Sequence, residues 1–212
     1  MKRFIPLFLS LFSATVLAHP HAFLDIKNRI IIEDEQLKGF EMAWTLDDLA
    51  SSELLYELKS NPNKQEAEEA IVADLSQTAI GNHYFSYLYD EHNQPIKFKA
   101  QPHKPRIEIK QNRVIYHFRF DLSQPQAVKG KSFQLYTYEP SYYLYMGYER
   151  PQDVSLNDDK LCTASLTEPQ VSSQIKNYAL SLDKSQTPDM PADDAQSLGA
   201  MFAQKVSLVC KK

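Results

Sequence analysis

The sequence lacks the short motifs that mark the commonest enzyme and nucleotide sites. It contains no HExxH, GxSxG, CxxC, P-loop or GxGxxG pattern. These absences exclude the usual motif-based assignments to zinc proteases, other hydrolases and nucleotide-binding proteins. Six histidines in 212 residues are an ordinary content, so any functional argument must rest on the positions of individual residues.

An excess of basic residues is also missing. Without Lys2 and Arg3, the chain has 21 basic and 27 acidic residues, which gives a net charge of −6. An acidic chain with no basic stripe argues against nucleic acid as a partner. The 194 residues after Ala18 fit one domain with a sizeable core. They are few for a two-lobed solute receptor of an ABC importer, which needs two α/β lobes around a cleft.

No segment is both long enough and apolar enough to span a membrane. The apolar stretch over residues 4–15 has about 12 residues, whereas a spanning helix needs about 20. It follows the basic pair Lys2-Arg3 and precedes the small-residue cleavage site Val16-Leu17-Ala18. We therefore predict that residues 1–18 are a signal peptide cleaved at its last residue, and that residues 19–212 form a single soluble periplasmic domain.

The only two cysteines, Cys162 and Cys210, both lie in the part predicted to be exported. In an oxidising compartment such a pair usually forms a disulfide, and we predict this bridge. Closing a loop of this length stabilises a fold by roughly 4 kcal/mol, because it reduces the entropy of the unfolded chain. A role as reactive thiols is the alternative, against which the large separation and the missing CxxC argue.

Hydrophobic periodicity predicts a single sheet-dominated α+β domain with two to four packed helices and one disulfide. Alternation predicts a strand over residues 22–33 with a hairpin partner over residues 37–44, and a period of two between Tyr84 and Tyr148. One helix is expected after Thr45 to Asp48, which resemble a capping box, and a second over residues 64–80 with Asn63 as N-cap. Further elements are predicted over residues 171–182 and 195–203 (helices) and 206–210 (a strand).

The arrangement His19-Pro20-His21 is the main candidate functional site. Cleavage after Ala18 would leave His19 with a free α-amine beside its imidazole. Residues two apart on an extended strand lie about 6.6 Å apart and on one face. The His21 ring can therefore converge with the His19 groups on one ion, at metal–nitrogen distances of about 2 Å. Pro20 has no N–H and so excludes a square-planar site built from successive deprotonated amides.

The remaining amine–imidazole chelate resembles the histidine brace of some copper proteins, and its nitrogen ligands suit nickel, cobalt, zinc and copper. Glu139, which precedes a proline at an expected bend, and Asp47 are candidates for an oxygen ligand. Asp25 has the same strand parity but lies about 13 Å beyond the second histidine. It is expected to orient neighbours or to pair with Lys27 or Arg29. The alternative is a frayed, solvated terminus whose histidines bind nothing.

His117 and the tyrosine-rich segment over residues 136–148 are interpreted as structural. His117 is expected to be exposed on the polar face of a strand, beside Arg119 and Asp121. The tyrosines between residues 136 and 148 are interpreted as strand formers in a half-buried sheet. A stacking platform for a planar ligand is the functional alternative.

Several short sequence motifs, taken in order along the chain, resemble those of one known family. They are His19-Pro20-His21 with Asp25, Trp44 to Asp48, Tyr84-Phe85, Tyr138 to Tyr143 and the ending from Phe202 to Cys210. Together they are similar to domain-of-unknown-function family 1007 over essentially the whole exported part. The resemblance implies a periplasmic component of an ABC-type transport system associated with nickel/cobalt or zinc transport, and it implies no established biochemical activity.

The function expected from the sequence is that of a periplasmic accessory protein of a transition-metal transport system. His19 and His21 would bind nickel, cobalt, zinc or copper and exchange it with an inner-membrane metal permease or ABC transporter, without enzymatic activity. Two alternatives stay open. One is a copper-loaded histidine brace that catalyses oxidation, and the other is a metal-independent interaction module whose tyrosine-rich surface binds an envelope partner.

Overall fold

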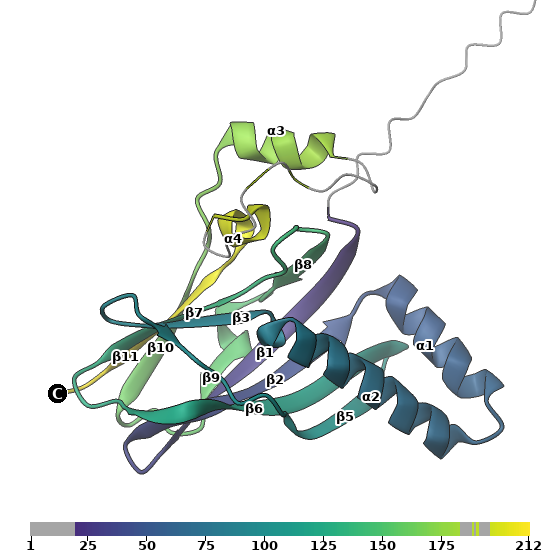
Figure 1. The fold of residues 1–212 in the computed structure, drawn as a ribbon, viewed down its shortest axis with the longest axis horizontal. Coiled ribbons are helices and arrows are strands. Elements are labelled where there is room, and N and C mark those ends of the chain that lie inside the picture. Colours follow the sequence, from purple (N-terminus) through teal and green to yellow (C-terminus); the bar gives the residue numbers. More distant parts are fainter. Residues whose placement is uncertain (1–19, 183–187, 189, 191–195) are drawn as a thin grey trace, which may run out of the picture.

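The computed structural model describes residues 20–182, 188, 190 and 196–212. The predicted signal peptide, residues 1–18, and His19 lie outside this part. The described residues form two β-sheets with helices packed against them (Figure 1). The predicted class, a sheet-dominated α+β fold with a disulfide, is confirmed.

The first sheet has six strands and contains the three longest ones. Its order is β5-β6-β2-β1-β8, and β9 pairs with a second part of β1. The strands pair antiparallel except for β8 and β9, which run parallel to β1. Their bounds are β1 (Ala22–Glu33), β2 (Gln36–Leu46), β5 (His103–Lys110), β6 (Arg113–Ala127), β8 (Leu144–Gly147) and β9 (Val154–Leu156).

The second sheet has five antiparallel strands in the order β10-β11-β7-β3-β4. Their bounds are β3 (Ser86–Asp90), β4 (Pro95–Ile96), β7 (Ser132–Thr137), β10 (Cys162–Thr167) and β11 (Lys205–Cys210). Apolar side chains of this sheet, among them Leu88, Phe133 and Leu208, belong to one core cluster with Ile30 and Phe40 of the first sheet. The two sheets therefore share a single core.

Alternation of side chains gives the first sheet an inner and an outer face. The inner face carries large buried side chains of β1, β2 and β6: Ile26, Ile30, Phe40, Trp44, Tyr116, Phe118 and Phe120. The residues between them are less buried and largely charged: Lys27, Arg29, Glu41, His117 and Arg119. Because a strand turns successive side chains to opposite faces, these charged groups lie on the outer face.

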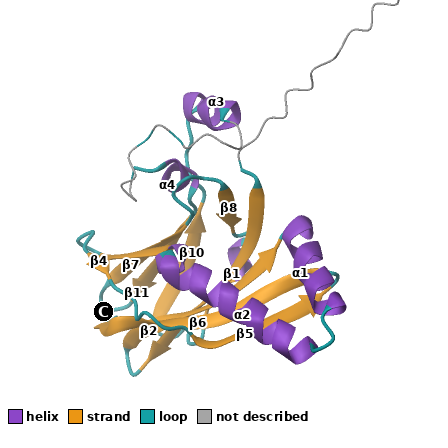
Figure 2. Ribbon diagram, turned by 45° about the vertical axis from the view of Figure 1, so that its right-hand side comes forward, coloured by secondary structure: helices purple, strands orange, loops and turns teal. Residues whose placement is uncertain are grey.

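Two helices follow β2, namely α1 (Asp48–Ser60) and α2 (Lys64–Gly81). The prediction for α2 is confirmed, with the Asn63 side chain accepting a hydrogen bond from the Glu66 amide. Its apolar stripe is buried, and Ser76 Oγ lies 2.8 Å from the hydroxyl of the core residue Tyr116. Figure 2 shows α2 crossing β5 and β6 on the inner side. Within the described ranges, no helix combines the length and apolar content needed to cross a membrane.

The last third of the chain adds the helices α3 (Ser173–Ser181) and α4 (Leu198–Phe202). Two short 3₁₀ segments precede them in the sequence, η1 (His83–Phe85) and η2 (Pro151–Asp153). Both late helices lie above the end of the molecule where β8 and the start of β1 are found (Figure 1). There Tyr142 stacks on Phe202 with ring centroids 4.1 Å apart. A small second apolar cluster thus covers the loop before β8.

The predicted disulfide is present. Cys162 on β10 and Cys210 on β11 lie directly opposite each other, with an S–S distance of 2.04 Å. The alternative, a reactive thiol, therefore has no free sulfur to act through. The bridge joins the last strand of the chain to its neighbour in the second sheet.

Three local predictions were wrong. The N-cap of α1 is Asp47 and not Thr45, because β2 continues to residue 46 and only Asp47 leaves the sheet with its side chain near the helix amides. Tyr84 lies in the 3₁₀ segment with φ of 58° rather than in a strand, since the chain must turn there from α2 into β3. His117 is not fully exposed: its side chain is 25% exposed and is bonded to Glu108 at 2.9 Å.

Candidate functional site

The start of β1 is fixed by backbone hydrogen bonds to the loop between β7 and β8. The His21 amide donates to the Tyr143 carbonyl at 2.9 Å, and the Ala22 amide donates to the same oxygen at 3.2 Å. The rings of His21 and Tyr143 also contact each other, with centroids 5.0 Å apart. His21 therefore has a defined place beside this loop, whereas His19 lies outside the described residues.

Glu139 organises that loop. Its carboxylate accepts hydrogen bonds from the Ser141 amide at 2.8 Å, the Ser141 hydroxyl at 2.6 Å and the Tyr143 amide at 2.9 Å. A longer contact of 3.4 Å reaches the Leu144 amide. Since the loop itself uses both carboxylate oxygens, Glu139 shapes the segment that carries the Tyr143 carbonyl and reaches His21 only through it.

Asp47 joins the start of α1 to the start of β1. One oxygen accepts a hydrogen bond from the Ala50 amide at 2.9 Å and thereby caps the helix. The other oxygen accepts from the Phe23 amide at 3.0 Å. Asp47 thus has two structural partners, and it lies next to the residues that follow His21.

The structure brings the predicted site residues around the beginning of β1 without making them one ligand set. Asp47 contacts Phe23 directly, while Glu139 acts through the backbone of Tyr143. Among residues 20–182, 188, 190 and 196–212, no three or more histidine, cysteine, aspartate or glutamate side chains are grouped so as to hold a metal ion. The other predicted nitrogen ligand, His19, lies outside these residues.

Asp25 lies on β1, four residues beyond His21. It pairs with Arg113 at 3.5 Å. The predicted pairing with Lys27 or Arg29 was wrong. Side chains two places apart on one strand can pair, as Arg119 and Asp121 do at 2.8 Å, but the tertiary structure gives Asp25 and Lys27 separate partners on other elements. Lys27 pairs instead with Asp153 at 3.7 Å.

The carboxyl group of Asp25 has a pKa above its ordinary value, mainly because it is partly buried. Burial raises the pKa of this carboxyl group, and the charges of Glu149 and Asp153 raise it further, while Arg113 lowers it. A raised carboxyl pKa means that the ionised form is poorly compensated.

The tyrosine-rich segment is mostly structural. Tyr138, Tyr142 and Tyr148 are buried. Two aromatic side chains near the start of β1 are about half exposed, Tyr143 at 49% and Phe23 at 47%. The segment is only partly a sheet, because residues 138–143 form the loop shaped by Glu139.

Sequence reasoning missed how the charged residues of the first sheet assemble. It placed His117 and Arg119 on a polar face, but the strand register sets them in rows with Arg29 of β1 and Arg106 of β5. The sequence showed which residues share a face of each strand, because side chains alternate along a strand. It did not show the order of the strands in the sheet, so the rows were not predicted.

Comparison with known proteins gives one family. The model of a protein family of unknown function, DUF1007, matches residues 4–210. A curated relative, an uncharacterized protein of Haemophilus influenzae, is 42% identical over 207 residues, which cover 97% of this chain and 98% of the relative. The resemblance predicted from the ordered motifs is therefore confirmed.

Proposed function

We propose, from the premise that this chain belongs to the DUF1007 family, that it is a periplasmic accessory protein of a transition-metal transport system. Export with cleavage after Ala18 would expose the amine of His19. That amine, the His19 ring and the His21 ring would bind nickel, cobalt, zinc or copper. The partner would be an inner-membrane metal permease or an ABC transporter, and the protein would act as a carrier without enzymatic activity.

The defined position of His21 is the observation that carries this proposal. The His21 and Ala22 amides are bonded to the Tyr143 carbonyl, and the Phe23 amide is bonded to Asp47. A ligand fixed before the metal arrives loses less entropy on binding than one on a free tail.

Glu139 and Asp47, the candidate oxygen ligands, also have structural roles. Glu139 and Asp47 would keep the start of β1 in place through the contacts described above. Each oxygen of Asp47 accepts one hydrogen bond, as does Oε1 of Glu139, so a lone pair remains on each of these atoms for an ion. A carrier must also release its ion, and a site made mainly of nitrogen ligands on a chain terminus offers a simple release route, because imidazole protonation below about pH 6 weakens binding.

The test begins with the exported protein, whose first residue is identified by mass spectrometry. Calorimetric titration with nickel, cobalt, zinc and copper should give one site per chain. His21→Ala, or one extra residue before His19, should reduce the affinity at least tenfold. His92→Ala is the matched control, because His92 lies in a turn with its side chain 77% exposed, and it should bind like the unmodified protein.

Two results would reject the proposal. One is a metal affinity that is the same in the His21→Ala and unmodified proteins. The other is a mature chain that does not begin at His19. Capture of a membrane partner by metal-free protein lacking both histidines would favour the interaction module, and the half-exposed Phe23 and Tyr143 would be the side chains to vary in that case.

A further inference from the structure

The outer face of the first sheet carries two adjacent rows of charged side chains. In the first row the strand register aligns Arg29 of β1, Glu41 of β2, Arg119 of β6 and His103 of β5. In the second row it aligns Lys27, Ala43, His117 and Arg106 on the same four strands. The rows are two residues apart along β1, β2 and β6, so they lie side by side on one face; along β5 they are three residues apart, because the register shifts between His103 and Arg106.

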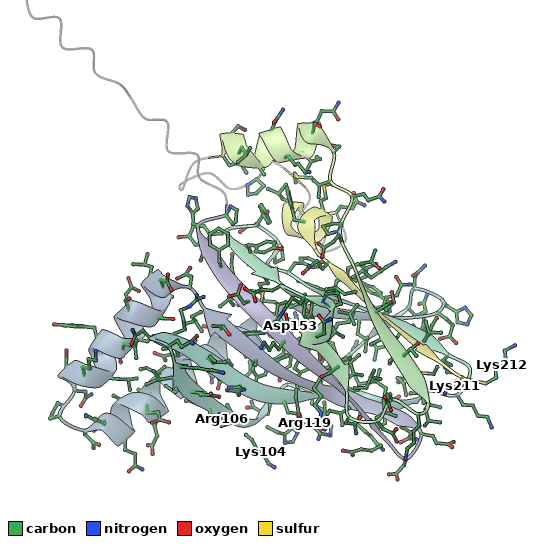
Figure 3. All side chains as sticks on the ribbon, turned by 180° about the vertical axis from the view of Figure 1, so that it is seen from behind. Lys104, Arg106, Arg119, Asp153, Lys211 and Lys212 are labelled. Atoms are coloured by element: carbon green, nitrogen blue, oxygen red, sulfur yellow. A yellow bond between two sulfur atoms is a disulfide. The ribbon has the colours of Figure 1, made fainter. Side chains whose placement is uncertain are left out.

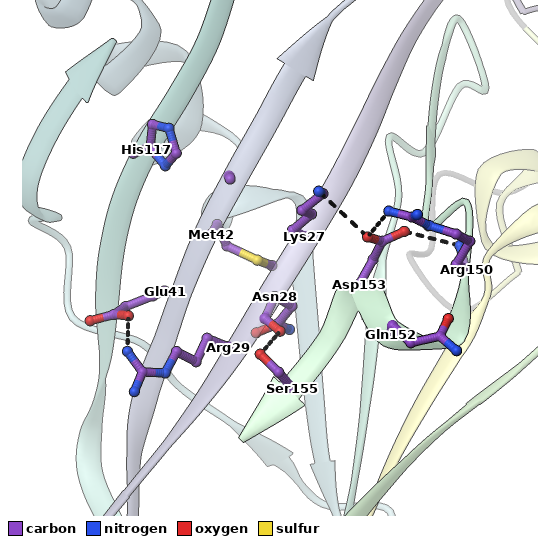
Figure 4. Close-up of a pocket in the computed structure, with 11 residues that line it drawn as sticks. Lys27, Asn28, Arg29, Glu41, Met42, His117, Arg150, Gln152, Asp153 and Ser155 are labelled. Carbon is purple, nitrogen blue, oxygen red and sulfur yellow. Dashed lines mark hydrogen bonds and ion pairs between the residues drawn. The ribbon is translucent and has the colours of Figure 1, made fainter. Parts of the chain in front are cut away.

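Ala43 leaves a hollow in the middle of these rows. It has only a methyl group, whereas its neighbours across the strands are Lys27 and His117. A cavity of about 410 Å³ lies over this position and is walled on the β1 side by Arg150 and Asp153 from the η2 segment (Figure 4). A second cavity of about 490 Å³ adjoins it, with His117 belonging to both.

The two cavities are lined by more cations than anions. Lysine and arginine side chains contribute six positive charges and carboxylates three negative ones: Lys27, Arg29, Lys104, Arg106, Arg119 and Arg150 against Glu41, Asp121 and Asp153. Figure 3 shows Lys104, Arg106 and Arg119 close together on the sheet. This positive region occurs on a chain whose net charge is −4. Long, exposed cationic side chains around a hollow are suited to an anion.

His117 adds a hydrogen-bonding group but little charge at neutral pH. Burial and the charge of Arg106 lower its pKa from the usual 6.5, while the hydrogen bond to Glu108 raises it. The imidazole is therefore mainly neutral at pH 7. The positive charge of the hollow comes from the lysines and arginines.

Three of these six cations make long contacts within the chain, whereas Arg119 lies 2.8 Å from Asp121 and is 28% exposed. Arg29 lies 3.5 Å from Glu41, Lys27 lies 3.7 Å from Asp153, and their side chains are 53% and 60% exposed. Arg106 is similar, at 3.8 Å from its acidic partner and 58% exposed. The pairs of Arg29 and Arg106 are exposed on both sides, and exposed ion pairs are worth about 0–1 kcal/mol. A guanidinium can bind a carboxylate through two N–H groups, so a bound carboxylate can replace these contacts at small cost.

We propose that the hollow over Ala43 binds a small organic anion with two or more carboxylate groups. One carboxylate would lie between Lys27 and Arg29 of β1, and a second near Arg119 of β6. Strands that are two apart in a sheet are separated by about 10 Å, a distance that these side chains shorten on reaching inward. These cations already contact carboxylates of the chain, and a guanidinium binds a carboxylate through two N–H groups; titration with inorganic phosphate tests the competing class of anion.

The experiment is calorimetric titration of the full exported chain with citrate and with succinate at constant ionic strength and pH 7. We expect saturable binding of one citrate per chain, weakened at least tenfold by Arg29→Gln and by Arg119→Gln. Ala43→Leu should weaken it by a similar factor while leaving every charge in place, because it fills the hollow. Lys59→Gln on the exposed side of α1 makes the same charge change elsewhere and should have no effect.

Circular dichroism melting curves identify any variant that does not fold. The binding comparison then uses only the folded variants. The proposal is overturned by any of three outcomes: absence of saturable citrate binding, an equal effect of Lys59→Gln and Arg29→Gln, or unchanged binding in Ala43→Leu. Tighter binding of inorganic phosphate than of citrate would overturn the assignment to carboxylates. Metal-free protein lacking His19 and His21 should still bind citrate, which separates this site from the proposed metal site.

Discussion

A single missing side chain, that of Gly199, sets how closely α4 approaches the loop after β7. A Cβ atom at this position would lie 1.9 Å from the carbonyl oxygen of Glu139. The Gly199 amide instead donates a hydrogen bond to the Pro140 carbonyl at 3.0 Å. The loop that fixes the start of β1 therefore depends on backbone-to-backbone contact with α4.

Gly199→Ala should destabilise the protein by about 1–3 kcal/mol, because the new methyl group must displace the backbone of the loop. Urea unfolding followed by fluorescence measures the change. Gly81→Ala is the matched control: nothing lies within 4 Å of a Cβ there, and alanine in a helix should be neutral or stabilising by up to about 1 kcal/mol. Equal stabilities of the two variants would show that the close approach does not matter.

Residue roles could be predicted from the sequence only where they depend on nearby residues. The Asn63 cap was predicted because its partner is three residues away, and the Cys162–Cys210 bridge because there is one possible pair. The role of Glu139 in bonding loop amides required the loop conformation, and the pairing of Asp25 with Arg113 joins residues from different strands. Such contacts are fixed by the tertiary structure.

Among the elements, α1 depends on a cap that it shares with β1. Asp47 accepts from the Ala50 amide of the helix and from the Phe23 amide of the strand. One carboxylate thus positions both the helix and the strand that begins next to His21. Loss of this group should affect both elements together.

Asp47→Ala should lower the free energy of unfolding by about 2 kcal/mol, from the lost cap and the lost bond to Phe23. Hydrogen exchange should become faster at the amides of Phe23 and Ala50 in particular. Asp48→Ala is the control, since the Asp48 side chain is 92% exposed and its removal should change stability by less than about 0.5 kcal/mol. Slower or unchanged exchange at both amides in Asp47→Ala would contradict the shared cap.

The sequence predicted most helices and strands but not which strands pair with each other. The bounds of β1, α2 and β11 follow from alternation, helix capping and a terminal apolar run, which are local properties. The parallel pairing of β1 with both β8 and β9 joins segments more than a hundred residues apart. Long-range pairings are selected by the fit of the whole core, so neither the strand order nor the charged rows on the outer face could be predicted.

For the whole molecule, the disulfide closes the second sheet near the C-terminus. Removing it in a Cys162→Ala/Cys210→Ala variant should cost about 4 kcal/mol, as estimated for a loop of 48 residues. Urea unfolding with and without dithiothreitol measures this cost. The reductant should lower the stability of the unmodified protein to that of the double variant and should leave the variant unchanged, because the chain has no other cysteine. A loss below about 1 kcal/mol would indicate that the core alone maintains the fold.

The straight run of β1 also sets a spacing between two regions of the molecule. His21 and Lys27 have the same strand parity and are six residues apart, which corresponds to about 20 Å. A ligand the size of citrate cannot reach both positions, and charges this far apart in solvent exceed the screening length of about 8 Å at physiological salt. Saturating one region should thus leave the affinity of the other unchanged, and one chain can carry both occupants at once.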